Sequence, residues 1–341
     1  MNIKKIYLVC SKFFYKNLIF DIKNPVNRDN CLYLYYLLKQ KFRENGFDLN
    51  TYDYFNKNAP EDYALLFLDS PKNINYYLKN HPGAKKFLIA YESPIKNTEN
   101  QKAENHRYFE KIFTWNDALA DNLKYFRLSY AQKIPKNSSF DINKKTKLCA
   151  AIFGHKLQTA PKELYSERIK AIRWFEKNNP EDFDLYGQGW NEHYFKDKLF
   201  HLNRIKFLKK LMIKPNFPSY KGYSKEKKET YKNYKFAICY ENASFDSYIT
   251  EKIFDCFFGG CVPIYLGAPN IADYIPENTF IDKRKFPTYE GLYLFIKNMP
   301  DNQYERYLED IKNFLESDKI YPFSAEFFAA TISKEIIKSI Y

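Results

Sequence analysis

The hydrophobic and polar positions along the chain alternate between short apolar runs and longer segments with helical spacing. Runs of four to six apolar residues, bounded by Pro or charged residues, occur at 64–68 and 86–91. Apolar residues recur at helical spacing in 29–45, which predicts a helix there. Because short apolar strands that alternate with helices are typical of a buried parallel sheet, the pattern predicts an α/β fold.

The predicted elements form two successive α/β halves. In the first half we expect strands at 6–10, 64–68, 86–91 and 112–115. In the second half the expected strands lie at 147–153, 183–187, 235–241 and 261–266. They alternate with helices at 162–177, 199–212 and 249–258, and a final pair of helices is expected at 301–317 and 323–340.

Residues 131–147 separate the two halves, because their apolar content falls and Pro, Asn, Ser and Lys predominate. We therefore predict a Rossmann-like N-terminal domain over 1–140 and a second one over 141–320, facing each other across a central cleft. Residues 321–341 are expected to form a C-terminal helix that can pack back on the first domain.

The composition excludes several other classes of protein. The 341 residues include 19% aromatic side chains and only 10 Gly, which argues against a disordered or collagen-like chain. A GxGxxG pattern is absent, so a dinucleotide-binding dehydrogenase is disfavoured. The six Cys lack metal-ligand spacing, and neither a signal peptide nor a membrane-spanning run is recognisable. We expect a cytoplasmic protein that can lie peripherally on the inner membrane.

The net charge of +13 points to an anionic partner such as nucleic acid, a membrane surface or a phosphorylated substrate. Only nine of the 54 basic residues are Arg, so much of the excess is a Lys-rich background on solvated faces. The Lys-rich stretch 204–235 could bind nucleic acid or anionic lipid, but we interpret it as a solvated helix and loop.

The densest cluster of candidate functional residues lies in 234–267. A buried strand ends in the polar loop 241–247, and 248–252 opens a helix. Such a loop is where open α/β sheets bind phosphorylated ligands, and Lys252 adds a positive charge. Glu251 would repel phosphate, but it is suited to the hydroxyls of a ribose or sugar. From spacing alone, Asp246 or Ser247 could instead cap the helix, with Glu251 complementing the helix dipole.

This cluster resembles the donor-binding signature of the bacterial-type α-1,3-fucosyltransferases, glycosyltransferase family ten. The matching elements are YKF at 234–236, YEN at 240–242, YITEK at 248–252 and VPIYLG at 262–267. Further similarity lies in SER at 166–168, DFDLYGQGW at 182–190, YESP at 91–94 and FTWND at 113–117. The resemblance extends over about residues 86–282.

The resemblance implies a GT-B fold with an N-terminal acceptor domain and a C-terminal GDP-fucose domain. It implies inverting, metal-independent transfer of L-fucose to an N-acetylglucosamine- or glucose-containing glycan, in α-1,3 linkage. N-acetyllactosamine, or a Lewis-type antigen of a lipopolysaccharide, would be such an acceptor. By the same resemblance Glu92 is the general base, and Arg168 and Lys252 neutralise the diphosphate. The donor-contacting positions that it implies are Asn242, Tyr248 and Glu251.

Reaction chemistry requires these kinds of residue. An inverting transfer proceeds in one displacement, so a carboxylate must take the proton of the acceptor hydroxyl. The leaving GDP gains negative charge, which a metal or fixed cations must stabilise. Glu92 follows an apolar run and precedes Pro94, so we expect it on a loop at the end of a strand. Without the resemblance, Glu92 would be interpreted as a surface carboxylate.

Two alternatives concern the diphosphate site. Arg168 could be a solvated residue near the helix start, or an ion-pair partner of Glu163 or Glu167, and Arg173 competes with it for the diphosphate. Asp182-Phe183-Asp184 has the DxD spacing by which other transferases bind a metal, and alternation would put both carboxylates on one side of a strand. We interpret this segment as structural and expect no essential metal or cofactor.

Other functions and several properties stay open. The same motifs would suit a GT-B transferase with a different nucleotide sugar, and the charge alone would suit a nucleic-acid or anionic-membrane binding protein. We expect no nucleic-acid partner, since the sequence offers no motif that reads a groove. The first 80 residues match no quoted motif, so the acceptor, its linkage and the oligomeric state are left open.

Overall fold

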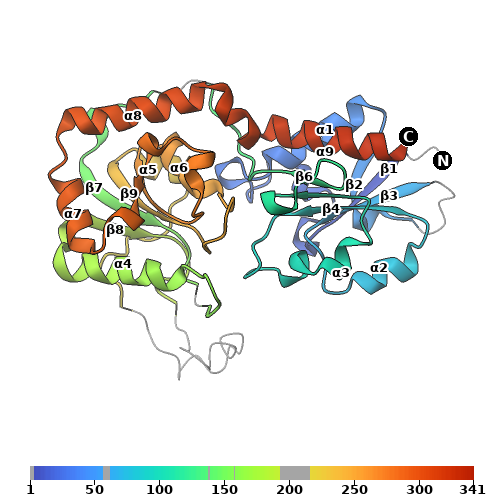
Figure 1. Cartoon of the computed structure of the whole chain (residues 1–341), viewed down its shortest axis with the longest axis horizontal. Helices are drawn as coiled ribbons and strands as arrows, with labels where there is room; N and C mark the ends of the chain where they lie inside the picture. The colour runs from blue at the N-terminus through green and yellow to red at the C-terminus, as the bar shows by residue number, and fades with distance from the viewer. Residues whose placement is uncertain (1–3, 57–61, 137–138, 157, 193–215) are drawn as a thin grey trace. The chain divides into compact units, whose positions relative to one another are not determined.

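The computed structural model describes residues 4–56, 62–136, 139–156, 158–192 and 216–341. Within these residues the chain divides into two compact units. Unit 1 contains Met1–Lys136, Asp246–Glu251 and Ser317–Tyr341, and unit 2 contains Asn137–Phe245 and Lys252–Glu316. Each unit is a parallel β-sheet with helices packed against it (Figure 1).

In the described part of unit 1, six strands form a sheet in the order β2-β1-β3-β4-β5-β6, and each neighbouring pair is parallel. The strands are β1 Lys5–Val9, β2 Asp48–Thr51, β3 Tyr63–Leu68, β4 Lys85–Ala90, β5 Lys111–Thr114 and β6 Tyr125–Arg127. The central strands are mostly apolar, since both of their faces are covered by other elements. In β3, for example, residues 64–67 have no solvent exposure.

Successive side chains of these strands enter two different hydrophobic clusters. Ile6 and Leu8 of β1 pack in the cluster on the side of helix α1, Tyr33–Glu44. Tyr7 and Val9 pack in the opposite cluster, on the side of helix α2, Ile74–Asn80. Figure 1 shows α1 above this sheet and α2 below it, together with the short helix α3, Ala103–His106.

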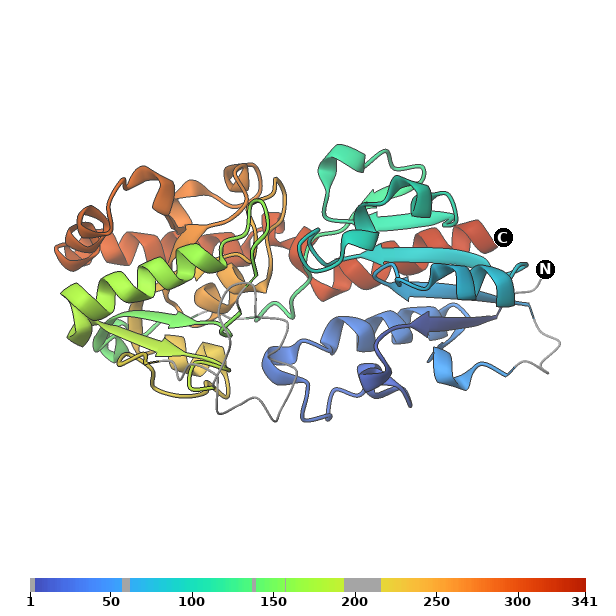
Figure 2. The same cartoon turned by 90° about the horizontal axis from the view of Figure 1, so that it is seen from below.

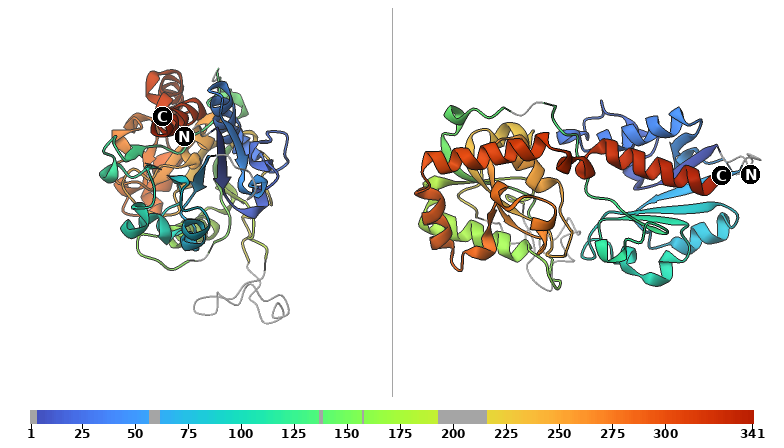
Figure 3. Two further views of the ribbon diagram at one scale, coloured as in Figure 1. Left: turned by 90° about the vertical axis from the view of Figure 1, so that its right-hand side faces the viewer. Right: turned by 45° about the horizontal axis from the view of Figure 1, so that its top comes forward.

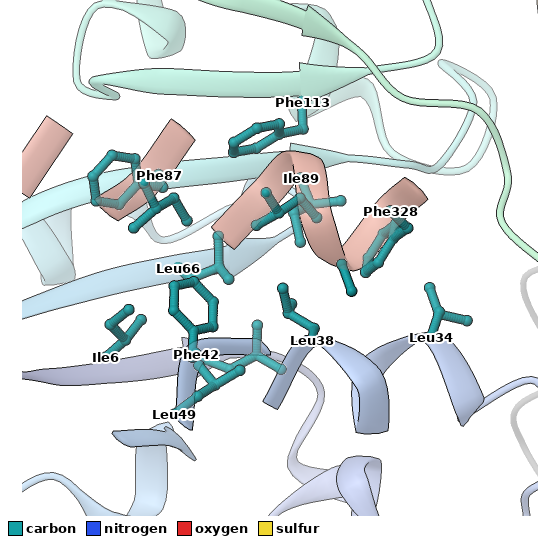
Figure 4. Close-up of a cluster of buried hydrophobic side chains, with 14 of the residues drawn as sticks. Ile6, Leu34, Leu38, Phe42, Leu49, Leu66, Phe87, Ile89, Phe113 and Phe328 are labelled. Atoms are coloured by element: carbon teal, nitrogen blue, oxygen red, sulfur yellow. The ribbon is translucent and has the colours of Figure 1, made fainter. Parts of the chain in front are cut away.

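The C-terminal helix α9, Ala325–Ile340, packs against α1 and completes the first of these clusters (Figure 3, right). Phe328 of α9 contacts Tyr35 of α1, with ring centroids 5.9 Å apart. Figure 4 shows Phe328 beside Leu34 and Leu38 of α1, with Ile89 of β4 close by. Ser324 caps the helix, since its side chain accepts a 3.0 Å hydrogen bond from the Phe327 amide. The last segment of the chain is thus part of the core of unit 1.

In the described part of unit 2, five strands form a parallel sheet in the order β11-β10-β9-β7-β8. The strands are β7 Lys147–Ile152, β8 Phe183–Tyr186, β9 Tyr234–Tyr240, β10 Val262–Leu266 and β11 Ile281–Asp282. The helices are α4 Tyr165–Asn178, α5 Lys227–Tyr231, α6 Glu251–Phe258, α7 Tyr289–Lys297 and α8 Asp301–Glu316. Figure 2 shows α4 lying over one face of this sheet.

The strand order of unit 2 reverses between β7 and β9. The chain leaves β7 through α4 toward β8, and it leaves β9 through α6 toward β10, on the opposite side. At such a reversal the two connections diverge above the carboxyl ends of the strands, which opens a crevice where α/β sheets bind ligands. In unit 2 this position lies beyond Ile152 and Tyr240.

Most predicted elements occur within two or three residues of their expected bounds, with a few differences. Helix α6 begins at Glu251 rather than 249, so the expectation that Asp246 or Ser247 caps it is wrong. Strands β2 and β6 were not anticipated, because they have only four and three residues and carry polar side chains. The helix expected at 199–212 lies outside the described residues. Of the helices in the described part of the chain, none combines the length and hydrophobicity that a membrane span requires.

Candidate functional site

Arg168 lies at the strand-order reversal of unit 2. It is in the first turn of α4, and only 3% of it is exposed. Its Nη2 donates to the carbonyl oxygen of Tyr240, the last residue of β9, at 2.6 Å, and Nε donates to the same oxygen at 3.2 Å. The guanidinium also lies over the rings of Phe153 and Tyr165, 4.8 and 5.2 Å from their centroids. Arg168 therefore bridges the ends of β7 and β9.

The structure brings together Arg168 and Asn242, two of the residues for which the resemblance implies contact with the donor. Nη2 of Arg168 donates to Asn242 Oδ1 at 3.0 Å. The Asn242 carbonyl in turn accepts from the Leu164 amide, just before α4, at 3.0 Å. The loop after β9 and the start of α4 are thus joined by both main-chain and side-chain hydrogen bonds.

The alternative expectation for Arg168, a solvated residue or an ion pair with Glu163 or Glu167, is wrong. Glu163 accepts hydrogen bonds from the amide and hydroxyl of Ser166, at 3.0 and 2.5 Å. Glu167 pairs with Lys170 at 2.6 Å. These carboxylates face solvent-exposed partners, whereas the Arg168 side chain turns inward to the sheet.

Arg173, the competitor of Arg168, is exposed and lies further along α4. Its Nη1 donates to Glu176 Oε2 at 2.6 Å and to the carbonyl of Asn216 at 2.7 Å. Its guanidinium stacks 3.8 Å from the ring centroid of Phe217. These contacts direct Arg173 to the segment that follows β8, away from the carboxyl end of β9.

Lys252 and Glu241 form an ion pair beside the start of α6. Lys252 Nζ lies 3.2 Å from Glu241 Oε2, and the two side chains are 15% and 0% exposed. The Glu241 amide donates to the Leu266 carbonyl at 2.8 Å, which extends the pairing of β9 with β10 by one residue. The Lys252 ammonium group is thus paired with a buried carboxylate.

Gly267 packs directly against Glu241. A Cβ atom at this position would lie 2.6 Å from Glu241 Cγ and 2.3 Å from the Tyr265 hydroxyl oxygen. Only glycine fits there without displacing a side chain.

Glu241 was not among the predicted site residues, although the YEN motif at 240–242 contains it. The position of this acidic residue, directly after an apolar strand, could have indicated a site residue.

Glu92 lies in unit 1, on the loop that follows β4, as expected. It is half-buried. Its amide donates to Asp69 Oδ1 at 2.9 Å, and its carbonyl accepts from Asn100 Nδ2 at 3.3 Å. The Glu92 main chain is therefore held by two side chains that the sequence did not single out.

Tyr248 and Glu251 also belong to unit 1, although they follow unit 2 segments in the sequence. Tyr248 is 1% exposed, and its ring lies 5.0 Å from Trp115 and 5.7 Å from Tyr130. The pKa of Tyr130 lies well above its usual range. Burial is the largest cause, and electrostatic interactions with Tyr248, Glu92 and Glu251 raise the pKa further. Glu92, Tyr248 and Glu251 therefore share Tyr130 as a neighbour in this unit, and sequence reasoning missed that tyrosine.

The carboxylates of the DxD segment have separate partners. Asp182 ends a 3-10 helix before β8 and accepts from Tyr293 at 2.8 Å and from Lys297 at 2.6 Å. Asp184, inside β8, accepts from Lys147 and Tyr234, both at 2.6 Å. Burial alone would raise the pKa of Asp184, but these hydrogen bonds and the charges of Lys147 and Lys221 lower it overall. Each Asp thus forms its own structural contacts.

Of the Lys-rich stretch 204–235, the structure describes residues 216–235. There Lys227 pairs with Asp255 at 2.6 Å, Lys232 with Glu229 at 2.7 Å, and Lys235 with Asp301 at 3.1 Å. Lys221 lies 3.4 Å from Asp184. Several Lys residues in this part of the stretch thus form ion pairs with acidic residues of the same unit. This agrees with the interpretation of the stretch as a solvated helix and loop.

Comparison with known proteins supports the sequence resemblance. The sequence model of glycosyltransferase family 10 (fucosyltransferase), C-terminal part, matches residues 142–321. An α-(1,4)-fucosyltransferase of Arabidopsis thaliana is 40% identical over 70 residues, which are 20% of this chain and 18% of the relative. An α-(1,3)-fucosyltransferase of Helicobacter pylori is 36% identical over 77 residues, 22% of this chain and 16% of the relative. The matched segments thus span less than a fifth of the length of these relatives.

The fold has a counterpart among solved structures. The crystal structure of an α1,3-fucosyltransferase with GDP-fucose matches with a TM-score of 0.58 at 17% identity, over 97% of this chain and 90% of that one. The two parallel α/β units together with this likeness confirm the predicted GT-B fold. Because the family model matches just over half of the chain, the chain belongs to glycosyltransferase family 10.

Proposed function

We propose that this protein is an inverting fucosyltransferase that moves L-fucose from GDP-fucose to a hydroxyl of an N-acetylglucosamine- or glucose-containing glycan, in α-1,3 linkage. The observation that carries the proposal is Arg168, a buried arginine at the strand-order reversal of unit 2, joined to Asn242 of the family motif. A guanidinium suits a diphosphate because it donates in a planar fork. Family membership favours GDP-fucose as the donor.

In the proposed reaction Glu92 acts as the general base. Its carboxylate accepts the proton of the acceptor hydroxyl while that oxygen attacks the anomeric carbon of fucose. The bond between the anomeric carbon and the diphosphate breaks in the same step, and GDP leaves with an additional negative charge. Arg168 and Lys252 stabilise this charge. Asn242, Tyr248 and Glu251 orient the donor. Arg173 has no role, because its contacts with Glu176 and Asn216 direct it away from the carboxyl end of β9.

The donor is tested by a thermal-shift panel of GDP, UDP, CMP and dTDP, each as the free nucleotide and as a nucleotide sugar. We expect GDP and GDP-fucose to raise Tm, because a ligand at about 100 times its Kd stabilises the native state by about 2.7 kcal/mol. Stabilisation by UDP sugars alone would instead favour a GT-B transferase with another donor. Tight salt-sensitive binding of RNA without a nucleotide-sugar response would replace the enzyme proposal altogether.

The acceptor and linkage are tested separately, with GDP-fucose and a glycan array that includes N-acetyllactosamine. Two relatives are named for different linkages, α-(1,4) and α-(1,3), so family membership alone leaves both open. We expect fucose on O3 of the N-acetylglucosamine or glucose residue, read by NMR of the isolated product. Fucose at O4 would contradict the proposed linkage and leave the proposed donor intact.

We also propose that transfer requires no metal ion. Two fixed cations, Arg168 and Lys252, are available for the diphosphate, and the DxD carboxylates Asp182 and Asp184 are engaged by Lys297 and Lys147. We therefore expect the initial rate of fucosyl transfer to be unchanged after treatment with EDTA. Loss of activity that Mg²⁺ or Mn²⁺ restores would contradict this. As a control, Asp184→Asn should lower Tm while transfer remains insensitive to EDTA.

A further inference from the structure

All four main-chain polar groups of Tyr91 and Glu92 are held by side chains. The amides of Tyr91 and Glu92 both donate to Oδ1 of Asp69, each at 2.9 Å. The Tyr91 carbonyl accepts from the Tyr130 hydroxyl, and the Glu92 carbonyl accepts from Asn100 Nδ2 at 3.3 Å. We call Asp69, Asn100 and Tyr130 the Glu92 clamp. It holds the main chain of two consecutive residues in the loop that follows β4.

The backbone of Asp69 is shaped to reach these amides. Asp69 follows β3, and its own amide donates to the Ile89 carbonyl of β4 at 2.9 Å. Its φ is +61°, a left-handed conformation that residues other than glycine seldom adopt, although Asp and Asn tolerate it best. This turn directs the carboxylate to the peptides that follow β4.

Asn100 completes the clamp from a separate segment. It is 2% exposed, and its Nδ2 donates to Asp69 Oδ1 at 2.7 Å as well as to the Glu92 carbonyl. Its Oδ1 accepts from the Ser70 amide at 2.7 Å. Asp69 Oδ1 thus receives three hydrogen bonds, and the loops after β3 and β4 are tied together through one carboxylate oxygen and one amide.

We propose that Asp69 is a positioning residue for Glu92, acting through the Glu92 clamp. This inference rests on the proposed function, in which Glu92 is the general base. A base must lie within hydrogen-bond reach of the proton that it removes, so small displacements of its main chain reduce the rate. With the main chain of Tyr91 and Glu92 held, only the side-chain torsions of Glu92 remain free to move the carboxylate. The Asp69 carboxylate accepts hydrogen bonds from the main-chain amides of Tyr91 and Glu92, and it affects the reaction only by holding Glu92 in place.

The test compares Asp69→Ala with Asp69→Asn. Because the three hydrogen bonds all end on Oδ1, asparagine keeps the accepting oxygen and removes the charge, whereas alanine removes the acceptor. We expect Asp69→Ala to lower kcat by about 100-fold, the effect of a displacement of roughly 1 Å, with an unchanged KM for GDP-fucose. Asp69→Asn should retain most of the wild-type kcat. Rates are normalised to GDP-binding sites counted by calorimetry, so that misfolded protein does not contribute.

Asp53→Ala is the matched control, since Asp53 also accepts a main-chain amide in unit 1, from Lys16 at 2.9 Å, without touching Tyr91 or Glu92. It should leave kcat unchanged. If Asp69→Ala does not fold, Asn100→Ala takes its place, because that change also frees the Glu92 carbonyl. A wild-type kcat in the folded variant, or an equal loss in Asp69→Ala and Asp69→Asn, would overturn the proposal.

Failure of the proposed function would be recognised independently. Wild-type protein that transfers no fucose from GDP-fucose, or a Glu92→Gln variant that retains full turnover, would remove the proposed chemistry. An inactive Glu92→Gln variant beside a fully active Asp69→Ala variant would remove only the positioning role of Asp69.

Discussion

Replacing Glu92 by Gln is expected to lower kcat for fucosyl transfer by about 10²–10⁴-fold, which is the usual contribution of a general base. Glutamine has the shape of glutamate and preserves the main-chain hydrogen bonds to Asp69 and Asn100, but it cannot accept a proton. Because the proposed role of Glu92 is to accept the proton of the acceptor hydroxyl, and the proposed contacts of the diphosphate are Arg168 and Lys252, the Kd for GDP should stay unchanged. Steady-state kinetics with GDP-fucose and calorimetry with GDP measure the two quantities.

Glu104→Gln is the matched control for this change. Glu104 is an exposed carboxylate of α3, in the same unit, and its loss should leave kcat and Tm as they are. Wild-type turnover in Glu92→Gln would show that another group accepts the proton. A weaker affinity for GDP in Glu92→Gln, with unchanged turnover, would assign Glu92 to donor binding instead.

The elements that carry the site could be predicted because they are strong local patterns. Strands β4 and β9 are apolar apart from Lys85, Lys86 and Lys235, and Glu92 and Glu241 lie in the loops that follow them. Parallel strands leave such loops at one edge of the sheet, so the placement of Glu92 after a strand follows from the sequence alone.

The partners of these residues could not be predicted, because they are distant in the sequence. Arg168 and Tyr240 are 72 positions apart, and only the packing of α4 on β9 brings the guanidinium to that carbonyl. Asp69 lies 23 positions before Glu92, in a loop with no recognisable motif. Its left-handed φ is a property of the folded chain, and the residue type gives only a weak hint of it.

The burial of the Glu241 and Lys252 charges could not be predicted from the sequence either. A Lys in the first turn of a helix and a Glu at the end of a strand are both solvent-exposed in most proteins. Here the loop after β9 and the start of α6 place Glu241 and Lys252 side by side, while Gly267 allows the backbone after β10 to close over Glu241. The loop after β9, the start of α6 and the segment after β10 together create this buried environment. The sequence of any one of these segments does not indicate it.

Replacing Lys252 by Met is expected to have two separable effects. The first is a weaker affinity for GDP, by about 10- to 100-fold, because hydrogen bonds to a charged group contribute about 1.5–3 kcal/mol. The second is a loss of stability, because the change removes the ion pair of the buried Glu241 carboxylate, and breaking such a pair costs about 3–5 kcal/mol. Calorimetry with GDP and chemical denaturation measure the two effects.

Lys227→Met is the matched control for stability. Lys227 pairs with Asp255 at 2.6 Å in the same unit, and their side chains are 15% and 8% exposed, close to the values for Lys252 and Glu241. We expect a comparable loss of stability with an unchanged Kd for GDP. The comparison distinguishes a diphosphate contact from the general effect of breaking a buried ion pair in unit 2.

The double variant Lys252→Met with Glu241→Gln decides between the two roles of Lys252. Removing the Glu241 charge eliminates the buried carboxylate that the single variant leaves behind, so the free energy of unfolding should recover most of its loss. The affinity for GDP should stay low, because the cation proposed to contact the diphosphate is still missing. If GDP affinity recovers together with stability, then Lys252 acts on the donor only by supporting the fold, and Arg168 would remain as the cation for the leaving diphosphate.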